Sequence, residues 1–141
     1  MSKEELDNLV KIRALKVEAP TRREFDGMVK SARRGLADAQ NESIATDSQF
    51  DLAYEAAHKF ALAALRTQGY RSENRITVFQ TLVHTLGTDR ADLQTFLKAH
   101  NERNLAAYEG RVDLDETLLE GLIAAAKRLE AAVGKLAPPH G

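Results

Sequence analysis

The sequence of 141 residues contains no cysteine, no tryptophan, only three prolines and no long run of apolar residues. The lack of cysteine excludes disulfides, zinc ribbons, iron–sulfur clusters and thiol nucleophiles, and it is compatible with a reducing compartment. With five phenylalanines and three tyrosines as its only aromatic residues, the core must be filled mainly by Leu, Ala and Val, which favours helices. The length is that of one ordinary domain, so we expect a single hydrophobic core.

The sequence also shows neither a secretory signal nor a membrane span, because acidic and basic residues alternate from Met1 to Lys11 and the apolar stretches are short. We therefore expect a soluble, cytoplasmic protein without a membrane partner. The formal net charge of −1 argues against a generally basic nucleic-acid binder. Basic residues nevertheless gather at 22–34 and 58–75, and acidic residues at 101–120. Two interpretations stay open: a solvated mosaic of charge, or a basic phosphate site together with an acidic surface that binds a basic partner or the protein's own basic patch.

Apolar residues recur at three- and four-residue spacing through most of the chain, which predicts amphipathic helices and no sheet. Predicted capping boxes mark three helix starts: Thr21 with Glu24, Thr46 with Gln49, and Asp113 with Glu116. Three glycines mark helix ends: Gly69, Gly87 and Gly110.

These signals predict an all-α fold, an antiparallel up-down bundle of four to five helices over residues 21–136. The third helix, near residues 76–87, is short and open to being split. The Ala-rich second helix predicts close helix packing. An amphipathic arm over residues 1–20 precedes the bundle, and a flexible tail over residues 137–141 follows it.

The histidines raise a metal hypothesis. Glu55 and His58 form a Glu-x-x-His pattern, the spacing found in di-iron bundles, but such bundles need a second pair that the sequence lacks. A site formed by His58, His84 and His100, each on a different predicted helix, would suit zinc or nickel. Isolated histidines more often bond a nearby carbonyl or carboxylate, so the favoured interpretation has no metal and no cofactor. The sequence also has neither a Gly-x-Ser-x-Gly elbow nor a Gly-rich phosphate loop.

The fourth predicted helix carries the most unusual polar residues. His100, Asn104 and Tyr108 are four residues apart and share one helix face, with Arg103 beside them. Their imidazole, amide, phenol and guanidinium groups suit a phosphate, a ribose hydroxyl or a base edge. The alternative is a polar network that fixes the helix register or a dimer interface.

At these residues the sequence resembles the HEPN (higher eukaryotes and prokaryotes nucleotide-binding) family, whose motif begins with Arg and often Asn near the end of a long helix, as Arg103-Asn104 does here. The resemblance extends to the Tyr- and Ala-rich segment 50–60, to Gly69-Tyr70-Arg71 and to His84, and covers about residues 21–136. It implies an all-helical homodimer of the kind found in toxin–antitoxin and phage-defence systems, often beside a nucleotidyltransferase-type antitoxin.

Active members of that family cleave RNA without a metal, using the motif Arg and a His brought together across the dimer. The resemblance implies that Arg103 binds phosphate, with Asn104 beside it and Tyr108 at the position of the motif His. Because the ordinary pKa of tyrosine is about 10 and that of histidine about 6.5, Tyr108 is a poor general base at neutral pH. His100 lies one turn before Arg103 and offers an imidazole instead.

We therefore expect an RNA- or nucleotide-binding domain, and any metal-independent endoribonuclease activity of Arg103 and Tyr108 is expected to be impaired. Two alternatives remain: a non-catalytic helical dimerisation or adaptor protein, and the three-histidine metal bundle.

Overall fold

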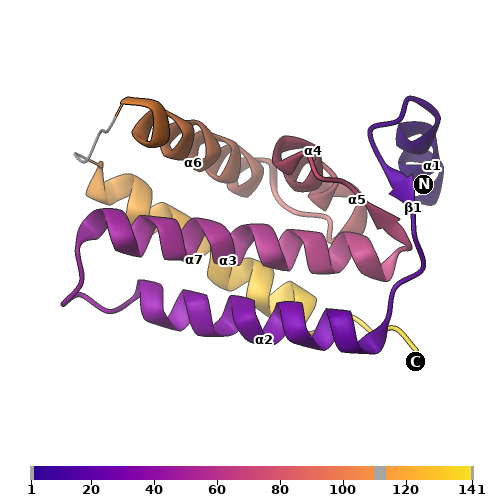
Figure 1. Cartoon of the computed structure of the whole chain (residues 1–141), viewed down its shortest axis with the longest axis horizontal. Coiled ribbons are helices and arrows are strands. Elements are labelled where there is room, and N and C mark those ends of the chain that lie inside the picture. Colours follow the sequence, from indigo (N-terminus) through magenta and orange to yellow (C-terminus); the bar gives the residue numbers. More distant parts are fainter. Residues whose placement is uncertain (1, 110–113, 141) are drawn as a thin grey trace.

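The computed structural model describes residues 2–109 and 114–140 and confirms the all-α prediction (Figure 1). The long helices are α2 (Arg22–Ala39), α3 (Thr46–Thr67), α6 (Arg90–Glu109) and α7 (Glu116–Val133). Between α3 and α6 the chain forms two short helices, α4 (Arg75–Gln80) and α5 (Leu82–Thr85), so the predicted third helix is split at Thr81. No helix in the described ranges is long and apolar enough to cross a membrane.

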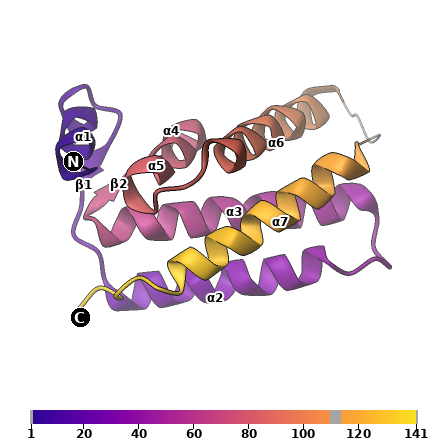
Figure 2. The same cartoon turned by 180° about the vertical axis from the view of Figure 1, so that it is seen from behind.

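Helix α3 lies at the centre of the bundle. It packs against α2 and α7 on one side and against α4, α5 and α6 on the other (Figures 1 and 2). Alanines at positions 53, 56, 57, 61, 63 and 64 of α3 are almost fully buried, which confirms the predicted close packing of this helix. Because their side chains are small, the neighbouring helices approach the α3 backbone closely.

The predicted arm packs against the rest of the fold over residues 2–20. Helix α1 (Ser2–Lys11) contacts α5, and Leu6 and Leu15 are buried in the common core. Strand β1 (Lys16–Val17) pairs antiparallel with β2 (Tyr70–Arg71), so the prediction of no sheet is wrong at these residues. Two-residue strands are too short to show the period-two alternation by which a strand is recognised in a sequence.

Arg66, at the end of α3, anchors the link between β1 and α2. Its side chain is 1% exposed, and its guanidinium donates to the carbonyls of Glu18 and Ala19 at 2.8 and 3.0 Å. Its Nε donates to Oε1 of Glu24 at 2.9 Å. Buried charge of this kind is stable only when it is paired and hydrogen-bonded, and here both conditions are met.

The capping predictions have mixed outcomes. Thr21 caps α2 through Oγ1, which accepts from the Glu24 amide at 3.1 Å, but the Glu24 carboxylate bonds Arg66 and not the helix backbone. The predicted Thr46–Gln49 box is wrong, since α3 begins after Ala45, which has no capping side chain. Gln49 donates to the Ala39 carbonyl instead, at 2.9 Å.

Helix α7 is capped by Asp115, whose carboxylate accepts from the amide of Thr117 at 2.8 Å. The predicted capping residue Asp113 and the predicted helix stop Gly110 lie outside the described residues. Gly69 and Gly87 follow α3 and α5 with φ of +90° and +64°, as expected of glycines that end helices.

Candidate phosphate-binding cluster

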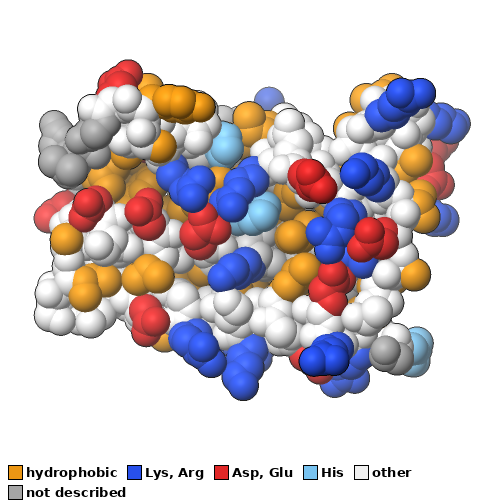
Figure 3. Space-filling model, viewed as in Figure 1, with side chains coloured by type: hydrophobic (Ala, Val, Ile, Leu, Met, Phe, Trp, Pro, Cys, Tyr) orange, Lys and Arg blue, Asp and Glu red, His pale blue; other side chains and the backbone are white. Residues whose placement is uncertain are grey.

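Two arginines from different helices meet on one carboxylate of α3. Nη1 of Arg75 and Nη2 of Arg103 lie 3.0 and 2.8 Å from the same oxygen, Oε2 of Glu55. We call these three residues the two-arginine clamp. Figure 3 shows basic, acidic and His side chains gathered on this face, between α3 and α6.

The phenol ring of Tyr54 lies beneath both guanidiniums. Their central carbons are 5.6 Å (Arg75) and 5.0 Å (Arg103) from the ring centroid, within the range of a cation–π contact. Tyr54 is fully buried, so the ring is a fixed surface against which the two guanidiniums rest. Arg75 is held at the start of α4 because Asn74 caps that helix, accepting from the amide of Thr77 at 3.1 Å.

A chain of hydrogen bonds continues from Tyr54 along α6. The Tyr54 hydroxyl is 2.7 Å from Nδ1 of His100, and Nε2 of His100 is 3.2 Å from the amide nitrogen of Asn104. With that amide donating to Nε2, the neutral imidazole carries its proton on Nδ1 and donates it to the Tyr54 oxygen. The bonds fix the orientation of the ring.

We call the clamp together with Asp51, Tyr54, His58, His100 and Asn104 the cluster. Its two histidines are neutral at pH 7. Burial lowers the pKa of His58 to about 4, with a further contribution from Arg75, and the His58 ring packs edge-on against Phe79. Burial and then the charges of Arg75 and Arg103 lower the pKa of His100. The positive charge of the cluster therefore comes from the arginines alone.

Acidic residues balance that charge. Glu55 neutralises one guanidinium, and Asp51, one turn earlier on α3, interacts electrostatically with Arg103. Burial also raises the pKa of Tyr54, which the nearby Arg75 counteracts, so the phenol stays protonated at neutral pH. The cluster is a nearly neutral arrangement of two strong cations and two carboxylates.

The structure unites three of the four predicted site residues. His100, Arg103 and Asn104 lie together as their spacing predicts, whereas Tyr108 is 89% exposed near the end of α6, two turns beyond His100. In the part of the chain that the structure describes, Tyr108 forms no hydrogen bond or ring contact with the clamp.

Three residues of the candidate site are not predicted from the sequence. The sequence places Tyr54 in the Tyr- and Ala-rich segment 50–60, Glu55 in the Glu-x-x-His pattern and Arg75 in the basic stretch 58–75, and none of these signals assigns them to the site. The signal for the site on α3 is a pair of adjacent polar residues, Tyr54 and Glu55, in a helix that is otherwise rich in alanine and buried. The position of Arg75 depends on how α4 packs, for which the sequence offers no signal.

The three-histidine metal site is not formed. His84 lies beside α1, where its Nδ1 is 2.8 Å from Oε2 of Glu5, whereas His58 and His100 belong to the cluster. Among residues 2–109 and 114–140, no group of three or more His, Asp or Glu side chains is arranged to hold a metal ion. The fold places α5 against α1, which separates His84 from the other two histidines.

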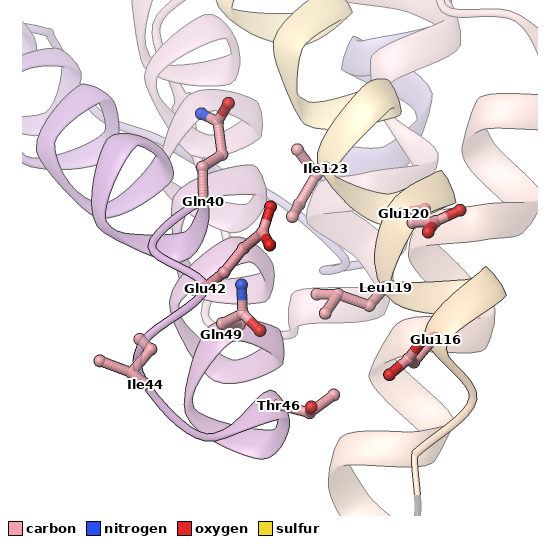
Figure 4. A pocket seen from close by; sticks show the side chains of 9 residues that line it. All are labelled: Gln40, Glu42, Ile44, Thr46, Gln49, Glu116, Leu119, Glu120 and Ile123. Atoms are coloured by element: carbon pink, nitrogen blue, oxygen red, sulfur yellow. The ribbon is translucent and has the colours of Figure 1, made fainter.

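A separate pocket of about 490 Å³ lies between the α2–α3 connection and the start of α7 (Figure 4). Its charged lining residues are all glutamates, namely Glu42, Glu116 and Glu120. In Figure 4 the Glu42 carboxylate points across the pocket towards α7. Carboxylates repel anions, so this pocket does not suit phosphate.

No protein-family model matches this chain, and neither a curated protein nor a solved structure matches it significantly.

Proposed function

We propose that this protein binds RNA or a nucleotide through the two-arginine clamp. The main observation that supports this proposal is that Arg75 and Arg103 lie side by side on one carboxylate oxygen. The Arg75 side chain is 32% exposed and the Arg103 side chain is 35% exposed, so both can reach a ligand. A guanidinium is a planar fork of N–H donors that matches phosphate oxygens, and it is charged at every physiological pH. The buried Tyr54 ring supports both guanidiniums independently of Glu55, so they meet a phosphate with little loss of side-chain entropy.

Asn104 and His100 extend the proposed site along α6. The Asn104 side chain is exposed, so its amide offers both a donor and an acceptor to a ribose hydroxyl or a base edge. His100 holds that amide in place from the side that faces Tyr54. Tyr108 lies outside this contact surface.

Binding and not cleavage is the main activity that we propose. Nδ1 and Nε2 of His100 are both engaged in hydrogen bonds. Tyr108 is exposed five residues beyond Arg103, a spacing that places the two side chains on different sides of α6, so neither residue is placed beside Arg103 as a free base. Any metal-independent endoribonuclease activity would be impaired and would depend on Arg103. From the HEPN resemblance we further propose a cytoplasmic homodimer in a toxin–antitoxin or defence module, with a nucleotidyltransferase-type antitoxin as partner.

The proposal is tested by titrating the protein into fluorescein-labelled single-stranded RNA and following fluorescence anisotropy. Arg103→Gln should weaken binding at least tenfold, while Arg23→Gln, which removes an exposed arginine of α2, should change it less than twofold. Both variants lose one positive charge, so a general electrostatic attraction would be reduced equally in the two. Equal affinities of the wild type and Arg103→Gln would contradict the proposal.

A second candidate function is that of a helical adaptor that binds no nucleotide. The observation that favours it is the internal pairing of these residues: Glu55 already forms ion pairs with both arginines, and Tyr54 and Asn104 already form hydrogen bonds with His100. Such a network can serve only to fix how α3, α4 and α6 pack. Absence of RNA or mononucleotide binding by calorimetry, in a preparation that sedimentation shows to be a stable dimer, would favour the adaptor.

A further inference from the structure

We propose that the two-arginine clamp selects a terminal phosphate monoester of its ligand over an internal phosphodiester, because Glu55 occupies the place of the phosphate. This inference rests on the proposed function and specifies its ligand. Three features support it: Glu55 competes with the ligand for both arginines, a monoester carries more negative charge than a diester, and a monoester presents more terminal oxygens.

Glu55 is a built-in competitor for the site. Its Oε2 accepts a hydrogen bond from Nη1 of Arg75 at 3.0 Å and forms an ion pair with Nη2 of Arg103 at 2.8 Å. A phosphate oxygen between the two guanidiniums would take the same place. A ligand that uses both arginines must displace that carboxylate. The Glu55 side chain is 31% exposed, so it can turn towards solvent without opening the core.

The charge of the ligand decides whether this exchange is favourable. An internal phosphodiester carries one negative charge, so it replaces the carboxylate by an equal charge and leaves Glu55 unpaired nearby. A monoester carries about −1.5 to −2 at pH 7 and gains more from the same two cations. Asp51 adds a second negative charge beside Arg103, which further disfavours a weakly charged ligand.

The number of acceptor atoms acts in the same direction. A monoester presents three terminal oxygens to the two guanidinium forks, whereas an internal diester presents two and continues as chain on both sides. His58 and His100 are neutral rings at pH 7, so they supply no charge that would compensate the diester. Discrimination therefore depends on the balance between the arginines and Glu55.

The test compares RNAs of eight nucleotides with one sequence and three end groups: a 5′-phosphate, a 3′-phosphate, and hydroxyls at both ends. Competition against a labelled RNA, followed by anisotropy at pH 7.5 and fixed salt, gives the three affinities. We expect each phosphorylated RNA to bind at least tenfold more tightly than the RNA with hydroxyl ends. Glu55→Gln should strengthen binding of all three and reduce that ratio, since the competing charge is gone.

Two results would overturn parts of the account separately. Equal affinities for the three RNAs, with Arg103→Gln still weakening all of them, would overturn the monoester selection and leave the proposed RNA binding intact. Absence of binding by all three would overturn both. The wild-type ratio alone decides the selection, so the test does not depend on the folding of Glu55→Gln.

Discussion

The hydroxyl of Tyr54 lies 2.7 Å from Nδ1 of His100 and joins α3 to α6 across 46 residues of sequence. Tyr54 is fully buried, and its ring also supports Arg75 and Arg103. One side chain thus orients the imidazole and both guanidiniums of the candidate site. The site is consequently supported by the bundle itself and not by a loop.

Replacement of this phenol tests how much the link stabilises the fold. Tyr54→Phe removes the hydroxyl and leaves Nδ1 of the partly buried His100 without its partner, which should lower the free energy of unfolding by about 1–2 kcal/mol. Tyr108→Phe makes the same chemical change on an exposed ring and should cost less than about 0.5 kcal/mol. Urea unfolding followed by circular dichroism measures both. Equal losses in the two variants would show that the Tyr54 bond contributes no stability.

The neutral state of His58 predicts a dependence of stability on pH. The folded protein holds the pKa of His58 near 4, whereas an ordinary histidine titrates at 6.5, so between these values the unfolded chain binds a proton that the folded protein does not. Unfolding is therefore favoured as the pH falls from 6.5 towards 4, by at most about 3 kcal/mol.

His58→Gln removes this titration. Wild type should lose stability relative to the variant when both are unfolded with urea at pH 7 and again at pH 4.5. Since carboxylates titrate in both proteins, the difference between the two losses isolates His58. Parallel losses would contradict a neutral, buried imidazole.

The buried arginine at the end of α3 should be important for stability. Arg66→Gln takes from Glu24 one of its two arginine partners and leaves the carbonyls of Glu18 and Ala19 without the guanidinium that donates to them. Removal of one partner from a buried charge pair typically costs about 3–5 kcal/mol. Arg22→Gln breaks only an exposed pair with Asp26 and should cost less than about 1 kcal/mol. Thermal unfolding distinguishes the variants, and a loss as small for Arg66 as for Arg22 would refute the structural role.

Two glycines should respond to alanine in opposite directions. Gly27 lies inside α2, and a Cβ there would meet no atom within 4 Å, so Gly27→Ala should stabilise the protein by about 0.5–1 kcal/mol through helix propensity. Gly69 has φ of +90°, which L-residues disfavour, so Gly69→Ala should destabilise it by about 1–2 kcal/mol. Chemical denaturation of both variants gives the two signs. Stabilisation by both would mean that the turn after α3 does not need its glycine.

The sequence predicts α2, α3 and α7 well because each of these helices carries its own apolar period. Their apolar stripes can be counted directly in the sequence, and the prediction that the short third helix can be split is confirmed at Thr81. The sheet was missed because β1 and β2 are two residues each and lie far apart in the chain. The caps of α2 and α3 depart from the pattern because Glu24 and Gln49 find tertiary partners in Arg66 and Ala39.

Half of the candidate site was predictable. His100 and Asn104 are four residues apart on one helix, so helical geometry alone brings them together, with Arg103 adjacent. Glu55 and Arg75 come from other helices, and their meeting depends on the register of packing. Tyr108 shares the spacing but lies where α6 extends past the core, so periodicity alone did not reveal its exposure.

The central claim is that Arg75 and Arg103 hold one phosphate together, and a double-mutant cycle of RNA affinity tests it most directly. Arg75→Gln, Arg103→Gln and the double variant are compared with the wild type by anisotropy at one salt concentration, after circular dichroism has shown each to be folded. If both arginines bind the same phosphate, each single variant should lose at least tenfold and the two losses should not add, with a coupling of at least about 0.5 kcal/mol. Unchanged affinity in the double variant, or losses that add exactly as those of independent sites, would contradict the claim.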